Sequence, residues 1–205
     1  SHFPDVLPLV PDFDADWTSN PTSSLVTTRC NPWHLGDRVL LLGDAAHAIV
    51  PFYGQGMNSG FEDARVLADL LDAHGGTVPD AAWRDLMGEF TALRKANGDA
   101  IGDLALRNFV EMRDRTGDPR FLLQKRIERR LTDRHPDRWI PLYSMVTFSH
   151  LPYAEAMKLG RIQDGIMAEV MDRPDIEAVW AGEDVERQAL ELAAERLPSS
   201  THETT

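Results

Sequence analysis

Cysteine, long apolar runs and basic side chains are all scarce in this chain of 205 residues. Cys30 is the only cysteine, which excludes an intrachain disulfide and a thiolate metal cluster and suits a reducing cytoplasm. The seven histidines have no i, i+3 or i+4 spacing to one another, so we expect no metal site. No apolar run approaches the roughly 18 residues of a membrane span and no signal peptide is recognised, so we expect a soluble protein.

Acidic side chains outnumber basic ones by 33 to 21, which gives a formal net charge of −12. Nucleic acids and anionic membrane surfaces are bound through basic patches, so neither is an expected partner. The hydrophobic share of 42% is sufficient for a buried core in one or two domains. The composition indicates a folded protein and says nothing further about its ligand.

Residues 38–63 are the most informative stretch of the chain. A short apolar run, residues 39–42, is closed by Gly43 and Asp44. The loop that follows contains a proline and three glycines, Pro51, Gly54, Gly56 and Gly60. A continuous apolar run of this length predicts a strand buried on both faces, as in a parallel sheet covered by helices. Ligands bind at the carboxyl edge of such sheets, and glycines there let backbone N–H groups approach a ligand closely.

Helical patterns dominate the rest of the chain. Residues 1–24 contain four prolines and are expected to have little regular structure, whereas the β-branched residues within 25–30 predict a strand. Apolar spacing predicts helices at residues 61–74, from Asp80 to about 112 with a bend or break at Gly98 or Gly102, from Pro119 (capped by Asp118) to about 131, from 152 to about 171, and from 184 to 196. Residues 142–148 are ambiguous, and the polar residues 198–205 are expected to be disordered.

The stretch at residues 43–63 resembles the second flavin-binding motif of the FAD-dependent aromatic hydroxylases. Gly43-Asp44-Ala45-Ala46-His47 is followed by Pro51 and by Gly54-Gln55-Gly56-Met57-Asn58, as in that family. Pro51-Phe52-Tyr53 before the glycines and Gly60-Phe61-Glu62-Asp63 after them are similar to the kynurenine 3-monooxygenases within the family. The resemblance covers roughly residues 20–170.

The resemblance implies an α/β flavoprotein fold that is incomplete in this chain, which by itself is mostly α with a few strands. Such enzymes open with a strand, a G-x-G-x-x-G turn and a helix for the ADP half of FAD, and that segment is not found here. We therefore expect the C-terminal part of a longer enzyme, with an N-terminal Rossmann half as its partner. The expected parts are residues 1–37 (end of the substrate-domain sheet and return to the FAD domain), 38–75 (C-terminal part of the FAD-binding domain), 76–197 (helical C-terminal region) and 198–205 (disordered tail).

The resemblance also implies roles for individual residues. The residues implied to hold FAD are Gly43, Asp44, Pro51, Gly54, Gly56, Met57 and Asn58. Asp44 is implied to bind the ribityl and pyrophosphate region, although an aspartate there is also a common helix cap. The amides of the glycine loop are implied to face the flavin pyrimidine edge, where the dipole of the following helix favours negative charge. Phe52 and Gln55 are implied to lie beside the flavin ring and the substrate, with core packing as the alternative for Phe52.

Asn108 and Tyr143 extend the resemblance beyond the motif. Asn108 shares an inward helical stripe with Leu104, so its amide must find partners there. The segments around Asn108 and Tyr143 resemble those that supply substrate-binding residues in kynurenine 3-monooxygenases. In that family both side chains hold the amino-acid carboxylate of the substrate. A structural hydrogen-bond network is the alternative for Asn108.

The implied activity is hydroxylation of the aromatic amino acid L-kynurenine to 3-hydroxykynurenine. NADPH would reduce FAD, and O2 would add at the flavin C4a to give the hydroperoxide that donates oxygen. No side chain is expected to act as an acid or base, and His47 is expected to fix the loop by hydrogen bonding. The basic run of Lys125, Arg126, Arg129, Arg130 and Arg134 fits a solvated helix face better than an NADPH phosphate site.

Two other functions remain open from the sequence. The chain fits another FAD-dependent aromatic hydroxylase or epoxidase that shares only the Gly-Asp motif. It also fits a non-catalytic fragment that lacks the ADP-binding half. A homodimer is left open as well.

Overall fold

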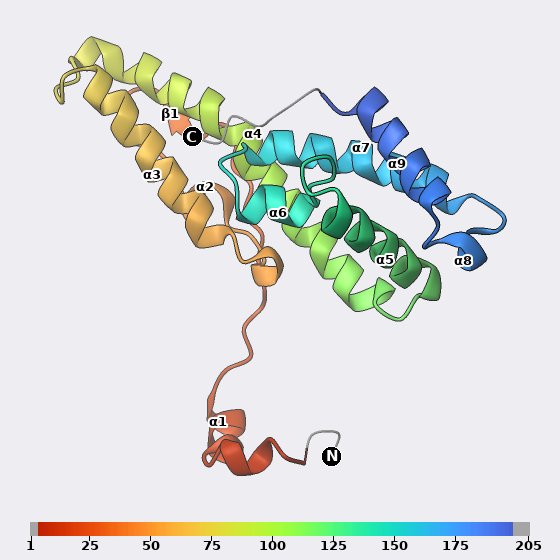
Figure 1. The fold of residues 1–205 in the computed structure, drawn as a ribbon. Helices are drawn as coiled ribbons and strands as arrows, with labels where there is room; N and C mark the ends of the chain where they lie inside the picture. The colour runs from red at the N-terminus through yellow and green to blue at the C-terminus, as the bar shows by residue number, and fades with distance from the viewer. Residues whose placement is uncertain (1–3, 199–205) are drawn as a thin grey trace.

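The computed structural model describes residues 4–198, in which helices predominate (Figure 1). The elements in chain order are η1 (Leu7–Leu9), α1 (Phe13–Ser19), β1 (His34–Leu35), β2 (Val39–Leu40), α2 (Asp44–His47), η2 (Pro51–Tyr53), α3 (Gly56–Ala73), η3 (Asp80–Ala82), α4 (Trp83–Val110), η4 (Glu111–Arg115), α5 (Pro119–Arg134), α6 (Leu142–Thr147), α7 (Tyr153–Met171), α8 (Ile176–Val179) and α9 (Glu183–Arg196). The prediction of a mostly α chain with a few strands is confirmed.

The N-terminal arm, residues 4–24, stands apart from the helical body (Figure 1). The prediction of little regular structure is wrong here, because η1 and α1 form short helices. Phe13 and Trp17 lie one helical turn apart in α1, and their rings stack with centroids 5.8 Å apart. Neither helix contains a buried residue, so the arm adds nothing to the hydrophobic core of the described chain.

Residues 25–30 run extended but form no strand, so that prediction is wrong. Their backbone donates to the segment at α2, from Thr28 N to Ala48 O at 2.8 Å and from Cys30 N to Ala46 O at 3.0 Å. A helical turn cannot offer the continuous row of carbonyls that a neighbouring strand presents. The extended segment is therefore attached at two points without becoming part of a sheet.

The strand expected at residues 39–42 is shorter and less buried than predicted. β2 pairs antiparallel with β1, with Val39 opposite Leu35 across the turn at Gly36. Val39 is 46% exposed and Leu42 is 36% exposed. A parallel sheet buried on both faces is therefore wrong for residues 4–198, because within them β1 is the only strand that pairs with β2.

α3 and α4 form a long antiparallel helix pair (Figure 1). Gly75 and Gly76 end α3 as predicted, with φ values of 68° and 75° that favour glycine. The long helix begins at Trp83 and not at Asp80, whose side chain makes no capping hydrogen bond. α4 is also uninterrupted, so Gly98 does not divide it. A Cβ at Gly98 would come within 2.8 Å of the Trp33 ring, so close packing explains this glycine.

The remaining helices agree closely with the predicted ranges. Asp118 caps α5 by accepting a hydrogen bond from Arg120 N at 2.9 Å. α7 and α9 occupy the ranges expected for them, and the ambiguous residues 142–148 contain α6. The short helix α8 was not predicted. The expected disordered tail falls almost wholly on residues 199–205, outside the described residues.

Three buried clusters hold the helical body together. Trp33, Ala46 and Phe90 pack between the hairpin region and the α3–α4 pair. A central cluster joins the loop before α3 to α4, α6 and α7 through Val50, Tyr53, Ile101, Leu104, Met145, Val146, Tyr153 and Leu159. A third joins α5, α7 and α9 through Ile127, Leu131, Trp139, Ile166, Met167, Val170, Val185 and Leu190. α4 contributes to the first two clusters and therefore connects the hairpin region to the central cluster.

Among the helices of residues 4–198, none combines the length and the apolar character that crossing a bilayer requires.

Candidate functional site

The Gly43–Asp44 turn packs directly against the first turns of α3. Gly43 has φ 56° and ψ −142°, a conformation almost restricted to glycine. A Cβ at Gly43 would lie 3.8 Å from the Cα of Gly60 in α3, so the two backbones are close neighbours. Asp44 is exposed at the start of α2. Its carboxylate is thus presented to solvent beside the N-terminus of α3.

A buried charged network, centred on Asp63, fixes this turn. The side chain of Asp63 is fully buried. Asp63 Oδ2 accepts hydrogen bonds from Gly43 N at 2.9 Å and from His47 Nε2 at 2.6 Å. Asp63 Oδ1 accepts from Arg94 Nε at 2.7 Å, and Arg94 Nη1 lies 2.9 Å from Glu62 Oε1. Burial by itself raises the pKa of Asp63, but the hydrogen bonds from His47, Arg94 and Gly43 outweigh it and hold that pKa below its usual value.

His47 has the loop-fixing role that was expected of it. Its ring is 3% exposed and stacks on Trp33 with centroids 5.0 Å apart. Asp63 and Arg94 are functional residues that sequence reasoning missed. Asp63 lies inside the recognised motif, but its partner Arg94 comes from the middle of α4, and no local pattern links the two.

The glycine loop leads into the N-terminus of α3 as expected. Gly54 has φ 69°, and Gly56 is the first helical residue. Pro51, Met57 and Asn58 are exposed. The first backbone N–H groups of a helix have no partner within it, so this end of an 18-residue helix offers donors and a positive dipole end to a ligand.

Gln55 lies on the inner side of the same loop. It is 4% exposed, and its Oε1 accepts from Asn58 Nδ2 at 2.9 Å and from Tyr153 Oη at 3.4 Å. Phe52 is half-buried and contacts Phe109, with ring centroids 4.5 Å apart. The geometry places these two predicted residues between the glycine loop and the helical body.

A cavity of about 420 Å³ lies between η2, the C-terminal part of α4, one side of α5, the start of α6 and the middle of α7. Of the four residues predicted to bind substrate, Asn108 and Tyr143 line it, whereas Phe52 and Gln55 do not. Tyr53 lines it too, although sequence reasoning assigned it no role, and its ring lies 5.8 Å from that of Tyr143. Burial raises the pKa of Tyr53 to about 12. The structure thus brings together two residues from distant parts of the chain and adds a third.

Asn108 connects this cavity to the glycine loop. Its Nδ2 donates to the carbonyl oxygen of Phe52 at 2.6 Å and approaches the Met112 Sδ at 3.7 Å. The structural network that was an alternative for Asn108 is therefore present. The same contact ties the loop before α3 to the C-terminal half of α4.

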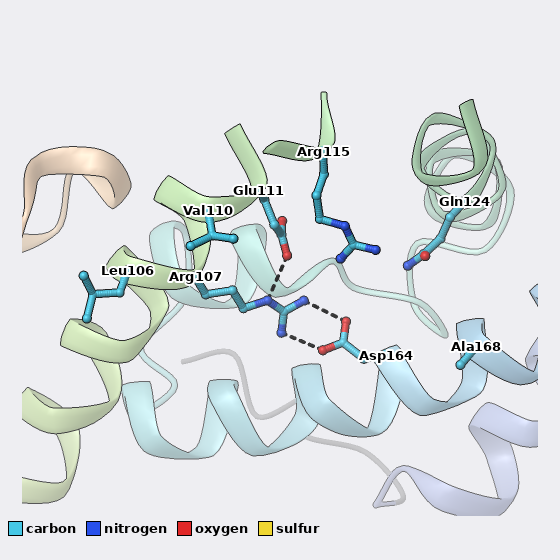
Figure 2. A pocket seen from close by; sticks show the side chains of 8 residues that line it. All are labelled: Leu106, Arg107, Val110, Glu111, Arg115, Gln124, Asp164 and Ala168. Carbon is cyan, nitrogen blue, oxygen red and sulfur yellow. Dashed lines mark hydrogen bonds and ion pairs between the residues drawn. The ribbon is translucent and has the colours of Figure 1, made fainter. Parts of the chain in front are cut away.

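Arg107, one residue before Asn108, holds two carboxylates. Its two terminal nitrogens bind both oxygens of Asp164 at 2.6 and 2.8 Å, and its Nε donates to Glu111 Oε1 at 2.9 Å (Figure 2). The hydrogen bonds that Arg107 donates to Asp164 raise its pKa; burial opposes this effect, and the hydrogen bond to Glu111 adds to it. These three side chains line the 420 Å³ cavity and also a second, more open one of about 580 Å³ drawn in Figure 2.

Four of the five side chains of the basic run on α5 pair with acidic side chains. Lys125 lies 2.8 Å from Glu128, and Arg129 lies 3.7 Å from Asp133. Arg130 and Arg134 both pair with the buried Glu186 of α9. These pairs leave little free positive charge, which supports the helix-face interpretation over an NADPH phosphate site.

The sequence of this chain is similar to those of known flavin-dependent proteins. Residues 10–102 match a family model described as FAD binding domain. A protein of Flavobacterium johnsoniae named kynurenine 3-monooxygenase is 50% identical over 191 residues, which are 93% of this chain and 42% of that protein. Proteins of the same name from Myxococcus xanthus and Xanthomonas oryzae pv. oryzae are 48% and 47% identical over 96% and 82% of this chain, and over 40% and 35% of their own lengths.

The chain thus spans about two fifths of the length of the curated relatives it matches. The FAD-binding family model covers the Gly43–Asp44 turn, the glycine loop, α3 and most of α4. The similarity to the named relatives extends beyond this family model and includes Asn108 and Tyr143. The chain is thus similar over most of its own length to proteins named kynurenine 3-monooxygenase, in agreement with its resemblance to the FAD-dependent aromatic hydroxylases.

Proposed function

We propose that this chain supplies the flavin-ring side and part of the substrate side of an FAD-dependent, NADPH-consuming monooxygenase that hydroxylates L-kynurenine to 3-hydroxykynurenine. The observation that carries the proposal is the 2.6 Å hydrogen bond from Asn108 Nδ2 to Phe52 O. This contact joins the loop implied to hold the cofactor to the cavity implied to hold the substrate. An oxygenase needs the two sites to be adjacent.

The residues around α3 fit a flavin. The turn at Gly43 requires glycine, and the exposed carboxylate of Asp44 is an acceptor suited to sugar hydroxyls. The amides of Gly56, Met57 and Asn58 in the first turn of α3 would stabilise negative charge on the flavin pyrimidine edge through the helix dipole. Bound flavin would supply the redox and oxygen chemistry that no side chain here provides.

The protein side chains contribute position and the exclusion of water. Pro51 and Phe52 would form an apolar wall beside the reacting ring, and the buried Gln55 would hold the loop through Asn58 and Tyr153. Asn108 and Tyr143 would contact the amino-acid end of the substrate in the 420 Å³ cavity. The proposal includes the rest of the enzyme as a partner and a cytoplasmic location, which the single cysteine supports.

The proposal is tested by assaying the flavin-loaded protein with NADPH, O2 and a panel of aromatic acids. We expect L-kynurenine to stimulate NADPH oxidation and to yield 3-hydroxykynurenine. Stimulation by another aromatic acid, with none by kynurenine, would instead indicate a different hydroxylase of the same family.

Substitutions at the two substrate residues test the site itself. We expect Asn108→Ala and Tyr143→Phe each to raise the KM for kynurenine about 10- to 100-fold, because a hydrogen bond to a charged group is worth about 1.5–3 kcal/mol. Steady-state kinetics with kynurenine as the varied substrate measure the effect. An unchanged KM in both variants would remove these residues from the site.

A further inference from the structure

We propose that Ser59, Arg94 and Tyr153 form a binding site for one buried water molecule. The site lies where α3, α4 and the start of α7 meet. The bound water would join the Asp63 network to the glycine loop before α3. The inference goes beyond the proposed function and does not depend on the identity of the substrate.

Two buried side-chain donors on neighbouring helices have no hydrogen-bond partner. Within residues 4–198, Ser59 Oγ in α3 and Arg94 Nη2 in α4 are both buried and unpaired. The two residues are 0% and 2% exposed. An unpaired polar group in the interior is costly, above all a charged one, so buried donors are normally bonded to protein atoms or to ordered water. These two atoms therefore indicate a bound partner.

Ser59 lies between the contacts that Arg94 and Tyr153 make with the α3 segment. Arg94 Nε donates to Asp63 Oδ1 at 2.7 Å, and Asp63 is four residues after Ser59. Tyr153 Oη contacts Gln55 Oε1, and Gln55 is four residues before Ser59. Residues four positions apart lie on the same face of a helix. The Ser59 hydroxyl is therefore on the face that meets both α4 and α7.

The Tyr153 hydroxyl is the third partner for a water molecule. Tyr153 is 7% exposed, and its Oη lies 3.4 Å from Gln55 Oε1, whereas hydrogen bonds between two oxygens normally end at about 3.0 Å. Burial raises the pKa of Tyr153, and the nearby charges of Glu62 and Arg94 act on it in opposite directions. The hydroxyl is therefore protonated at neutral pH and close to the ion pairs of Arg94. It can donate one hydrogen bond and accept two.

The charges around Arg94 favour water over an anion as the ligand. Three donors would also suit a halide ion. Arg94, however, already pairs with Glu62 at 2.9 Å and with Asp63 at 2.7 Å, so the carboxylates exceed it by one negative charge. Even a protonated His47, which binds Asp63, would only bring the sum to zero. Such a site does not attract an anion, whereas it offers a neutral water molecule the two to four polar partners that buried waters have.

A crystal structure at a resolution that shows ordered water tests the site directly. We expect density for a water within about 3.2 Å of Arg94 Nη2 and of at least one of the two hydroxyls. Crystals soaked in bromide should give no anomalous peak at this position. A direct protein partner for Arg94 Nη2, a lack of density beside it, or a bromide peak would each overturn the proposal.

Magnetic relaxation dispersion of the water oxygen nucleus counts long-lived buried waters in solution. Ser59→Val replaces the hydroxyl by a methyl group and should lower this count by one. The matched control is Thr91→Val in α4, because the Thr91 hydroxyl already bonds Met87 O at 2.8 Å and His34 Nδ1 at 2.9 Å. It should leave the count unchanged. An equal count in the parent and in folded Ser59→Val would overturn the proposal, and if that variant does not fold, the crystal structure of the parent decides.

Discussion

The buried carboxylate of Asp63 is expected to contribute strongly to the stability of the fold. It accepts hydrogen bonds from Gly43, His47 and Arg94 and has no exposed surface. Removing one member of a buried ion pair typically costs about 3–5 kcal/mol, because the partner charge stays buried and unpaired. We expect Asp63→Asn to lower the free energy of unfolding by about 3 kcal/mol, measured by urea denaturation.

The control for that substitution is Asp69→Asn on the same helix. Asp69 is exposed and pairs with Arg65 at i,i+4, a contact worth only about 0.5 kcal/mol or less. Equal losses of stability in the two variants would contradict the conclusion that the buried interactions of Asp63 stabilise the fold.

The same carboxylate makes stability depend on pH. The pKa of Asp63 is lower in the folded protein than in the unfolded chain, despite its burial, because of the hydrogen bonds from His47, Arg94 and Gly43. The stabilisation is therefore complete above the unfolded pKa of about 4 and is lost as pH falls through the folded pKa. Thermal unfolding between pH 6 and pH 2 should show this loss in the parent and a shallower one in Asp63→Asn.

At the scale of one element, α4 carries glycines with opposite roles. A Cβ at Gly98 would lie 2.8 Å from the Trp33 ring and 3.0 Å from His47, whereas a Cβ at Gly88 would meet no atom within 4 Å. We expect Gly98→Ala to destabilise the protein by about 1–3 kcal/mol through overpacking. Gly88→Ala should stabilise it by up to about 1 kcal/mol through helix propensity. Chemical denaturation of both variants measures the difference, and a stabilised Gly98→Ala would refute the packing explanation.

The elements also show what could be predicted from sequence. α3, α5, α7 and α9 were predictable because apolar spacing, the Asp118 cap and the Gly75–Gly76 stop are local signals. The extended, unpaired course of residues 25–30 was not predictable, because a β-branched composition cannot show that the neighbouring segment is a helical turn. The Asp63–Arg94 pair was missed for a related reason: each residue reads as an ordinary charge on its own helix.

On the scale of the whole molecule, stability is concentrated in the helical body. The N-terminal arm, residues 4–24, buries no side chain, whereas α9 buries Val185, Ala189 and Leu190. We expect removal of residues 1–20 to change the free energy of unfolding by no more than about 0.5 kcal/mol, and removal of residues from 183 onward to abolish cooperative unfolding. Thermal unfolding followed by circular dichroism distinguishes these outcomes, and a large loss from the first deletion would contradict the structure.

The candidate site was recoverable from sequence only in part. The glycine loop is a contiguous motif, and Asn108 and Tyr143 were found through resemblance. Tyr53 and Glu111 became visible only when the cavity around them was known. A cavity is made by helices far apart in the chain, so its charge balance cannot be counted along the sequence.

The unbroken course of α4 has a consequence for how these sites can change. Arg94, which anchors the Gly43–Asp44 turn through Asp63, and Asn108, which lines the 420 Å³ cavity, are on the same continuous helix. Each residue of an α-helix advances about 1.5 Å and rotates about 100°. The insertion of one residue between them would therefore turn the Asn108 side chain away from Phe52, although no residue of either site would be changed. The number of residues between Arg94 and Asn108 is therefore constrained as strictly as the identity of any residue in the two sites.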